Sequence, residues 1–253
     1  MKKILLLSLS VVLASCGGGG GSSSSCSTLK VSGGESCDDG VASVAYLEID
    51  TSAGSVTCTG TYISQTAILT ARHCLPGRVS AVTASSKGYV RSGYQVLLHS
   101  SLDLAIVKIS EPIGAAPVPV FLFDPPPAIG DEVTAYGYGI DETGSSASDR
   151  VLNGEAPLKA TSLSFVGTLP GLGYVTASNG SGNICKGDSG GPVLAKNASG
   201  RYGIIGVTSY SPHLSETVRC VPIQEGFEAV EVSIQNAIAT EFILGNVPDA
   251  SAQ

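Results

Sequence analysis

The sequence predicts an all-β protein with a helix only near the C-terminus. Short alternating or apolar runs separated by Gly, Ser, Pro and Asp turns are typical of strands, and no long helical period occurs before Val232–Leu244. The segment Glu111–Pro119, which contains three prolines, is typical of a linker between two halves of similar size. Many short strands in two halves favour two packed antiparallel barrels or sandwiches.

The individual elements follow from these patterns in chain order. In the first half, strands are expected at Val44–Ile49, Ala67–Thr70, Tyr94–Leu98 and Leu104–Ile109. In the second half, they are expected at Glu132–Tyr136 and Gly203–Ser209. The terminal helix is expected over Val232–Leu244, because one helical face could carry Ile234, Ala237, Ile238 and Phe242.

Composition excludes two classes of function. The chain of 253 residues has 43% hydrophobic and 14% charged residues and a net charge of −7, which suits a compact body. It contains no Lys/Arg cluster, so nucleic acid is not an expected partner. The three histidines, His73, His99 and His213, are widely spaced, and we expect neither a metal site nor a cofactor.

The N-terminus has the pattern of an export signal over residues 1–15, with two lysines followed by a short apolar run. Leu13–Cys16 resembles the lipobox of bacterial lipoproteins, which implies cleavage before Cys16 and acylation of that cysteine. Gly17–Ser25 then predicts a flexible tether. The residue after the lipobox cysteine is Gly17 and not aspartate, which, by analogy with bacterial lipoproteins, favours anchoring of the protein in the outer membrane. The alternative is an ordinary signal peptide with an incidental cysteine.

Export places the chain in an oxidising compartment, where disulfides persist. Six cysteines remain beside Cys16, and six allow fifteen pairings, so their spacing alone selects none.

A glycine-rich segment around Ser189 indicates nucleophilic chemistry. Cys185–Pro192 sets one hydroxyl among three glycines, with Asp188 on one side. Glycines allow positive φ and close approach, so the N–H groups of Gly187 and Ser189 can converge on a developing oxyanion. A serine needs a base to take its proton. Without one, the segment is a turn between strands.

A base and an acid occur in two other segments. His73 lies in Thr70–Cys74, after an expected strand, and Asp103 lies in Ser101–Lys108, at the start of another. A carboxylate flanked by leucines needs a hydrogen-bond donor, which an imidazole N–H can supply. The serine segment also fits the GxSxG elbow of α/β-hydrolases, but that fold needs an acid and then a histidine after the serine. No acidic residue lies between Ser189 and His213, which excludes it.

Together, these three segments resemble the histidine, aspartate and serine motifs of the chymotrypsin/trypsin-like serine proteases, over about residues 31–244. The resemblance implies two packed six-stranded antiparallel β-barrels and peptide hydrolysis through an acyl-enzyme. In it, Ser189 is the nucleophile, His73 the general base and Asp103 its orienter, with an oxyanion hole at Gly187 and Ser189. It also implies the disulfides Cys58–Cys74 and Cys185–Cys220, which leave Cys26 and Cys37 to pair.

These inferences divide the chain into five parts. Residues 1–15 are the signal peptide and 16–30 the lipidated tether and propeptide. The first barrel is expected over 31–118, the second over 119–231, and a C-terminal helix and tail over 232–253.

The segment Lys30–Gly34 resembles the activation site of the same family. The resemblance implies that cleavage after Lys30 frees the amino group of Val31, which inserts and pairs with Asp188. Ser32 departs from the usual valine, and the alternative is a flexible leader with a chance lysine. If Cys26 pairs with Cys37, the cleaved enzyme stays joined to its lipid.

Positions counted from the serine motif place the base of the substrate pocket at the uncharged Asn183, beside Ile184. Ser209, Tyr210 and Ser211 resemble the substrate-binding strand, with Ser211 narrowing the entrance. These residues predict a small, neutral pocket, and Lys186 could attract an acidic substrate residue. Cleavage after Lys30 would then need a separate Lys-cleaving protease.

The sequence therefore predicts an exported, lipid-anchored serine endopeptidase that faces an oxidising compartment. Its expected partners are a protein or peptide substrate, the activating protease and the membrane, and we expect a monomer. Two alternatives remain. One is a protease-shaped surface protein that binds without cutting, and the other is an esterase that uses the same three residues.

Overall fold

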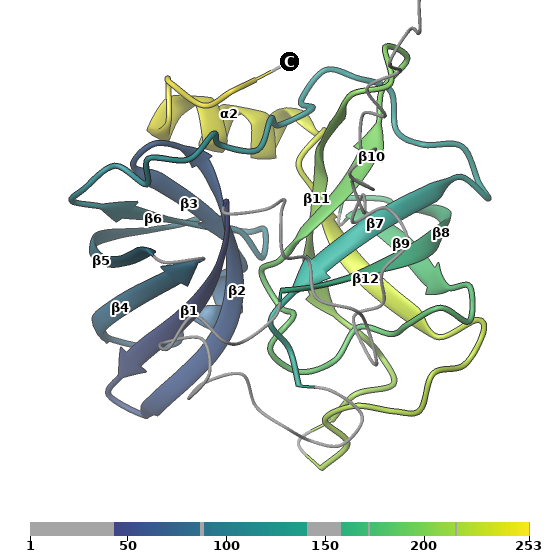
Figure 1. The fold of residues 1–253 in the computed structure, drawn as a ribbon, viewed down its shortest axis with the longest axis horizontal. Helices are drawn as coiled ribbons and strands as arrows, with labels where there is room; N and C mark the ends of the chain where they lie inside the picture. The colour runs from purple at the N-terminus through teal and green to yellow at the C-terminus, as the bar shows by residue number, and fades with distance from the viewer. Residues whose placement is uncertain (1–42, 87–88, 141–157, 172, 216, 253) are drawn as a thin grey trace, which may run out of the picture.

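The computed structural model describes residues 43–86, 89–140, 158–171, 173–215 and 217–252. Two closed antiparallel barrels of six strands each lie side by side (Figure 1). This architecture confirms the predicted fold class. Successive side chains of a strand point to opposite faces, so each strand contributes every second side chain to the barrel interior.

The first barrel has the strand order β1-β2-β3-β6-β5-β4. Its strands are β1 (Val44–Thr51), β2 (Gly54–Ser64), β3 (Ala67–Thr70), β4 (Val79–Ser86), β5 (Tyr89–Leu98) and β6 (Ala105–Ile109). Glu111–Pro119, the predicted linker, runs along this barrel: the N–H groups of Ile113 and Val118 donate to the carbonyls of Gln65 and Tyr62 at 3.0 Å each.

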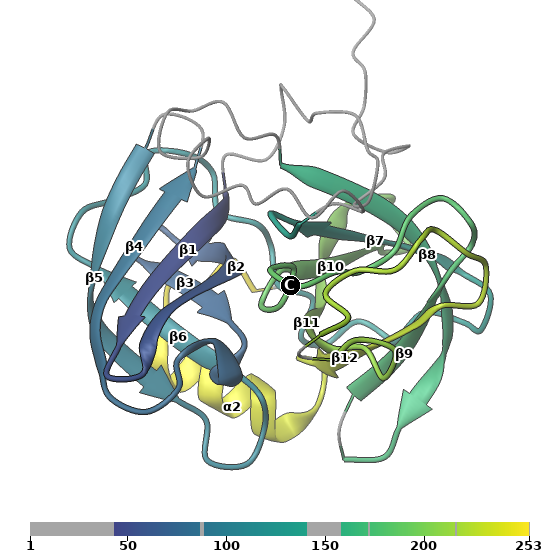
Figure 2. The ribbon, with the colours of Figure 1, turned by 90° about the horizontal axis from the view of Figure 1, so that it is seen from below.

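The second barrel has the order β10-β11-β12-β9-β8-β7. Its strands are β7 (Glu132–Gly137), β8 (Lys159–Leu169), β9 (Gly173–Ser178), β10 (Pro192–Lys196), β11 (Tyr202–Tyr210) and β12 (Glu228–Ser233). The two barrels therefore have the same topology: the fourth strand of each pairs with the first strand and not with the third. Figure 2 shows the two barrels side by side.

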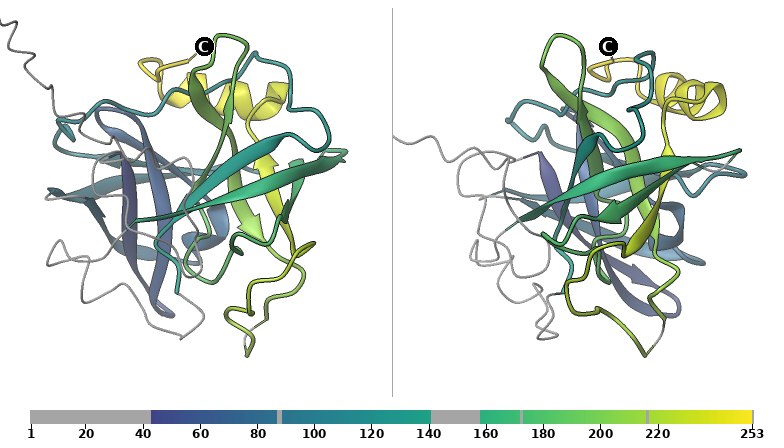
Figure 3. Two further views of the ribbon diagram at one scale, coloured as in Figure 1. Left: turned by 45° about the vertical axis from the view of Figure 1, so that its right-hand side comes forward. Right: turned by 90° about the vertical axis from the view of Figure 1, so that its right-hand side faces the viewer.

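The C-terminal helix α2 (Ala237–Asn246) packs on the first barrel, although it follows the second (Figure 3). The ring of Phe242 lies 5.0 Å from that of His99, edge to face, and the Lys108 ammonium donates to the Asn246 carbonyl at 2.6 Å. Among the described residues, no helix has the length and apolar character needed to span a membrane.

The predicted start of this helix is wrong. Val232 and Ser233 end strand β12, and the helix begins at Ala237 because the Asn236 side chain accepts from the Ala239 N–H at 2.9 Å. Ile234 is buried before the helix, and Ile238 is 58% exposed. The apolar residues of 232–244 therefore belong to two elements, the end of strand β12 and helix α2.

Candidate active site

His73 lies in a single 3-10 turn, η2 (Arg72–Cys74), directly after β3. The Arg72 guanidinium donates to the carbonyls of His99 and Ser100, at 2.9 Å each, so this turn is tied to the segment that carries Asp103. The His73 N–H donates to Asp103 Oδ1 at 2.8 Å, and His73 Nδ1 lies 2.7 Å from Asp103 Oδ2. Two contacts thus fix the imidazole against the carboxylate.

Asp103 receives a third hydrogen bond, from the second barrel. The Ser209 hydroxyl donates to Asp103 Oδ2 at 2.6 Å. Partial burial by itself would raise the pKa of Asp103, but the contacts with His73 and the Ser209 hydroxyl outweigh it and hold that pKa below its usual value. The carboxylate is therefore ionised at neutral pH and can orient an imidazole.

Ser189 lies on the loop before β10, where glycines make close approach possible. Gly187 has φ +99° and Gly190 has φ +82°, a region that glycine enters without strain. A Cβ on Gly190 would lie 2.1 Å from Thr70 Oγ1 and 2.2 Å from the Thr59 carbonyl oxygen. The loop therefore docks directly on β2 and β3 of the first barrel.

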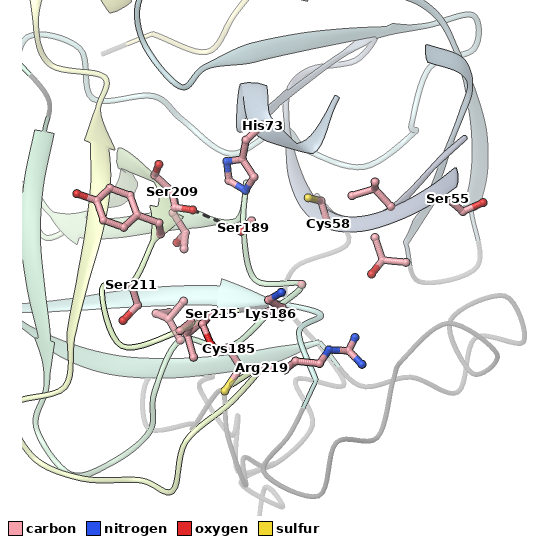
Figure 4. A pocket seen from close by; sticks show the side chains of 17 residues that line it. Ser55, Cys58, His73, Cys185, Lys186, Ser189, Ser209, Ser211, Ser215 and Arg219 are labelled. Atoms are coloured by element: carbon pink, nitrogen blue, oxygen red, sulfur yellow. Dashed lines mark hydrogen bonds between the residues drawn. The ribbon is translucent and has the colours of Figure 1, made fainter. Parts of the chain in front are cut away.

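The docked loop places the Ser189 side chain beside His73. The Ser189 carbonyl accepts from the Thr59 N–H at 2.8 Å, and its hydroxyl donates to the Ser209 carbonyl at 3.4 Å. Figure 4 shows the imidazole of His73 directed toward Ser189, with both side chains lining one cavity. The three residues singled out in the sequence are thus brought together at the junction of the barrels.

Asp188 does not line this cavity and is 1% exposed. Its Oδ1 accepts from the Gly139 N–H and its Oδ2 from the Cys185 N–H, at 2.8 Å each. Burial raises the pKa of Asp188 to about 7, against the opposing effect of these two N–H groups and of Lys159. No basic side chain within the described ranges lies at ion-pair distance from this carboxyl.

The cavity between the barrels measures about 820 Å³. It includes Ile184, Ser209, Tyr210 and Ser211 of the predicted pocket, but not Asn183. Asn183 is fully buried, with its amide donating to the Pro222 carbonyl at 2.8 Å. The serine motif predicts Asn183 as the base of the pocket. In the structure its neighbour Ile184 lines the cavity, and Asn183 itself is buried with its amide bonded to Pro222.

Three lining residues of β2 were missed because nothing in their local sequence marks them: Ser55, Val56 and Thr57. The long loop before Cys220, which the sequence marks as a possible part of the pocket wall, contributes Leu214, Ser215 and Arg219. The role of Ser209 beside Asp103 was also missed, since 106 positions separate the two residues.

Two predicted disulfides are present, Cys58–Cys74 and Cys185–Cys220, with Cα atoms 6.1 and 4.7 Å apart. One crosslinks β2 to the histidine turn, and the other joins the serine loop to the segment after Arg219. Cys58, His73 and Cys74 are close enough to share a metal, but this disulfide consumes both thiols. Part of the predicted anchor and activation site lies outside the described residues: Cys16, Lys30 and Val31. The predicted Cys26–Cys37 disulfide lies outside them too.

Comparison with known proteins identifies the family and the fold. Residues 31–222 match the model of the Trypsin family. An uncharacterized peptidase of Corynebacterium glutamicum strain R is 29% identical over 151 residues, 55% of this chain and 50% of that protein. A trypsin of Saccharopolyspora erythraea is 26% identical over 203 residues, 71% of this chain and 86% of that protein.

A solved collagenase structure has the same fold, with a TM-score of 0.59 and 20% identity over 81% of this chain and 93% of that one. The chain spans about half the length of the curated Corynebacterium peptidases that it matches. The family model covers most of the chain, and by this match the chain belongs to the Trypsin family.

Proposed function

We propose that the chain is a serine endopeptidase in which Ser189, His73 and Asp103 act as a catalytic triad. One observation carries the proposal: Asp103 holds His73 by two hydrogen bonds, and His73 and Ser189 face the same cavity between the barrels. The family match and the peptidase names of two relatives support it.

The proposed reaction follows from this arrangement. Nδ1 of His73 is directed at Asp103, so Nε2 is the nitrogen available to take the Ser189 proton. The Ser189 oxygen attacks the substrate carbonyl, and the N–H groups of Gly187 and Ser189 receive the oxyanion. His73 then returns the proton to the departing amine, which leaves an acyl-enzyme. Water, deprotonated by His73, releases the second product and restores the hydroxyl.

We propose further that the chain is made as a zymogen, cut between Lys30 and Val31. The buried carboxyl of Asp188 supports this, because burial disfavours its charged form despite two backbone N–H donors, and a new ammonium beside it would stabilise that form. The family match begins at Val31. Acylation of Cys16 and a Cys26–Cys37 disulfide would keep the cleaved enzyme on the membrane. A Cys26→Ser protein that stays on the membrane after cleavage would contradict this tether.

The deciding experiment is labelling with a fluorophosphonate probe and hydrolysis of a casein substrate, before and after limited cleavage at Lys30–Val31. Ser189→Ala removes the nucleophile and should abolish labelling, and Asp103→Asn should lower kcat by about 10⁴-fold. Labelling only after cleavage supports the zymogen, and equal labelling in both forms removes it. A protein that never labels is the non-catalytic binding protein, and one that cuts esters but not casein is the esterase.

A further inference from the structure

Two cationic side chains line the cavity although the chain is acidic. Of the 17 described residues that line it, the lysine and the arginine are Lys186 and Arg219. The chain as a whole has a net charge of −7. Asp188 lies in the same loop as Lys186, but its side chain is buried and does not line the cavity. Two cations on the lining of a cleft attract the acidic groups of a ligand.

The two cations are held next to each other by the backbone. Lys186 directly follows Cys185, and Arg219 directly precedes Cys220, its disulfide partner. The Lys186 N–H donates to the Arg219 carbonyl at 2.9 Å. Figure 4 shows both side chains on the same rim of the cavity, on the side of Ser189 away from His73. Their proximity is therefore built into the fold.

Among the described residues, the rest of the lining supplies no anion that would compete with an acidic substrate group. Hydroxyl side chains line the cavity from both barrels, at Ser55, Thr57, Ser209, Ser211 and Ser215, and no carboxylate of the described residues lines it. The Ser209 and Ser211 hydroxyls already donate, to Asp103 and to the Glu228 carbonyl. The donors that face a substrate carboxylate are therefore the Lys186 ammonium and the Arg219 guanidinium.

We propose that Lys186 and Arg219 make the cleft selective for peptides that carry an acidic side chain next to the scissile bond. This inference rests on the proposed peptidase function and names its substrate class. It also bears on activation. The segment from Thr28 to Gly33 carries a cation at Lys30 and no acidic residue, so the cleft disfavours its own activation site, and a different protease must cut there.

The test uses the cleaved full-length protein and four pairs of peptides. The four varied positions are the two residues before the scissile bond and the two residues after it. The peptides of a pair are identical except for Glu or Gln at one of these positions. We expect kcat/KM to favour Glu over Gln by about two- to five-fold at one or more positions, as for partly exposed ion pairs. The preference should shrink between about 50 and 500 mM salt, since salt screens exposed charges.

The Lys186→Gln/Arg219→Gln variant should bring the Glu-to-Gln ratio to about one, and Lys186→Glu/Arg219→Glu should invert it. The matched control is Lys196→Gln/Arg201→Gln, which removes two exposed cations at the β10–β11 turn, outside the cavity lining. This control should keep the wild-type ratio. A ratio near one in the wild type, or a preference that survives in the cavity variant, overturns the inference.

A binding measurement separates this inference from the peptidase function. Ser189→Ala protein is titrated into the same labelled peptides, and affinity is read by fluorescence anisotropy. Tighter binding of the Glu peptides supports acidic selectivity even if the wild type cleaves nothing, in which case only the peptidase function fails. Equal affinity for Glu and Gln peptides overturns the selectivity even if the wild type is an active peptidase.

Discussion

The partly buried Asp103 and the fully buried Glu231 have pKa values shifted in opposite directions. Asp103 accepts hydrogen bonds from His73 and from Ser209, and its pKa is lowered. Glu231, fully buried on β12, accepts a hydrogen bond from the Thr176 hydroxyl at 3.0 Å, and its Oε2 has no hydrogen-bond partner among the described residues. Burial raises the pKa of Glu231 to about 7, against the effects of Thr176 and Thr208.

Glu231 therefore makes stability depend on pH. Between its ordinary pKa of 4.5 and about 7, the folded chain keeps a proton that the unfolded chain has released. The free energy of unfolding must fall as pH rises through this window, by at most about 1.4 kcal/mol per pH unit for this group. Glu231→Gln should flatten that slope and be more stable than the wild type at pH 8. Urea unfolding at pH 5, 6, 7 and 8 measures it.

The matched control is Glu228→Gln, at an exposed position on the same strand. It should leave the pH slope of the wild type unchanged. An unaltered slope in Glu231→Gln would mean that the buried carboxyl does not hold its proton up to neutral pH.

At the scale of elements, the serine loop depends on one glycine for its contact with the first barrel. In Gly190→Ala, the new Cβ meets Thr70 and the Thr59 backbone at about 2 Å, in addition to the cost of φ +82°. We expect a loss of at least about 3 kcal/mol and loss of fluorophosphonate labelling, because Ser189 is displaced. Urea unfolding and the labelling rate check both.

Gly200→Ala separates the cost of the close contact from the cost of the positive φ. Gly200 has φ +78°, but a Cβ added there would have no neighbouring atom within 4 Å. This variant should lose only about 1–2 kcal/mol, the cost of the left-handed backbone, and should label normally. Equal losses in the two alanine variants would show that the close approach of the loop to β2 and β3 is not required.

At the scale of the whole molecule, Thr59 joins the two barrels. Its buried hydroxyl donates to the Gly187 carbonyl at 2.8 Å and accepts from the Tyr138 N–H at 3.0 Å. Thr59→Val keeps the shape of the side chain but removes both bonds. We expect a loss of about 2–4 kcal/mol, because buried polar groups lose their partner, and weaker labelling at Ser189. Urea unfolding and labelling measure the two effects.

Thr51→Val is the comparison for this change. Thr51 also donates one hydrogen bond, to the Gly54 carbonyl, and accepts one, from the Ala53 N–H, but it does so on the exposed end of β1. Water can replace those bonds, so the loss should stay below about 1 kcal/mol. If both valine variants lose the same stability, the contact between the barrels contributes nothing beyond two ordinary hydrogen bonds.

Local sequence determined the all-β class, the division into two halves, and the three segments around His73, Asp103 and Ser189. Each of these follows from neighbours within a few residues, such as apolar alternation or glycines around a hydroxyl. The helix start was misplaced because apolar spacing alone does not separate the end of β12 from a helix that Asn236 caps.

Only the tertiary structure decided what lies across the junction of the barrels. Ser209 bonds Asp103, Asn183 lies buried behind the cavity, and Arg219 lies beside Lys186. These relations depend on how two closed barrels and a disulfide bring distant segments together. The order of the strands and the docking of the loops bring these residues into contact, and the pattern of a single segment cannot predict contacts between distant segments.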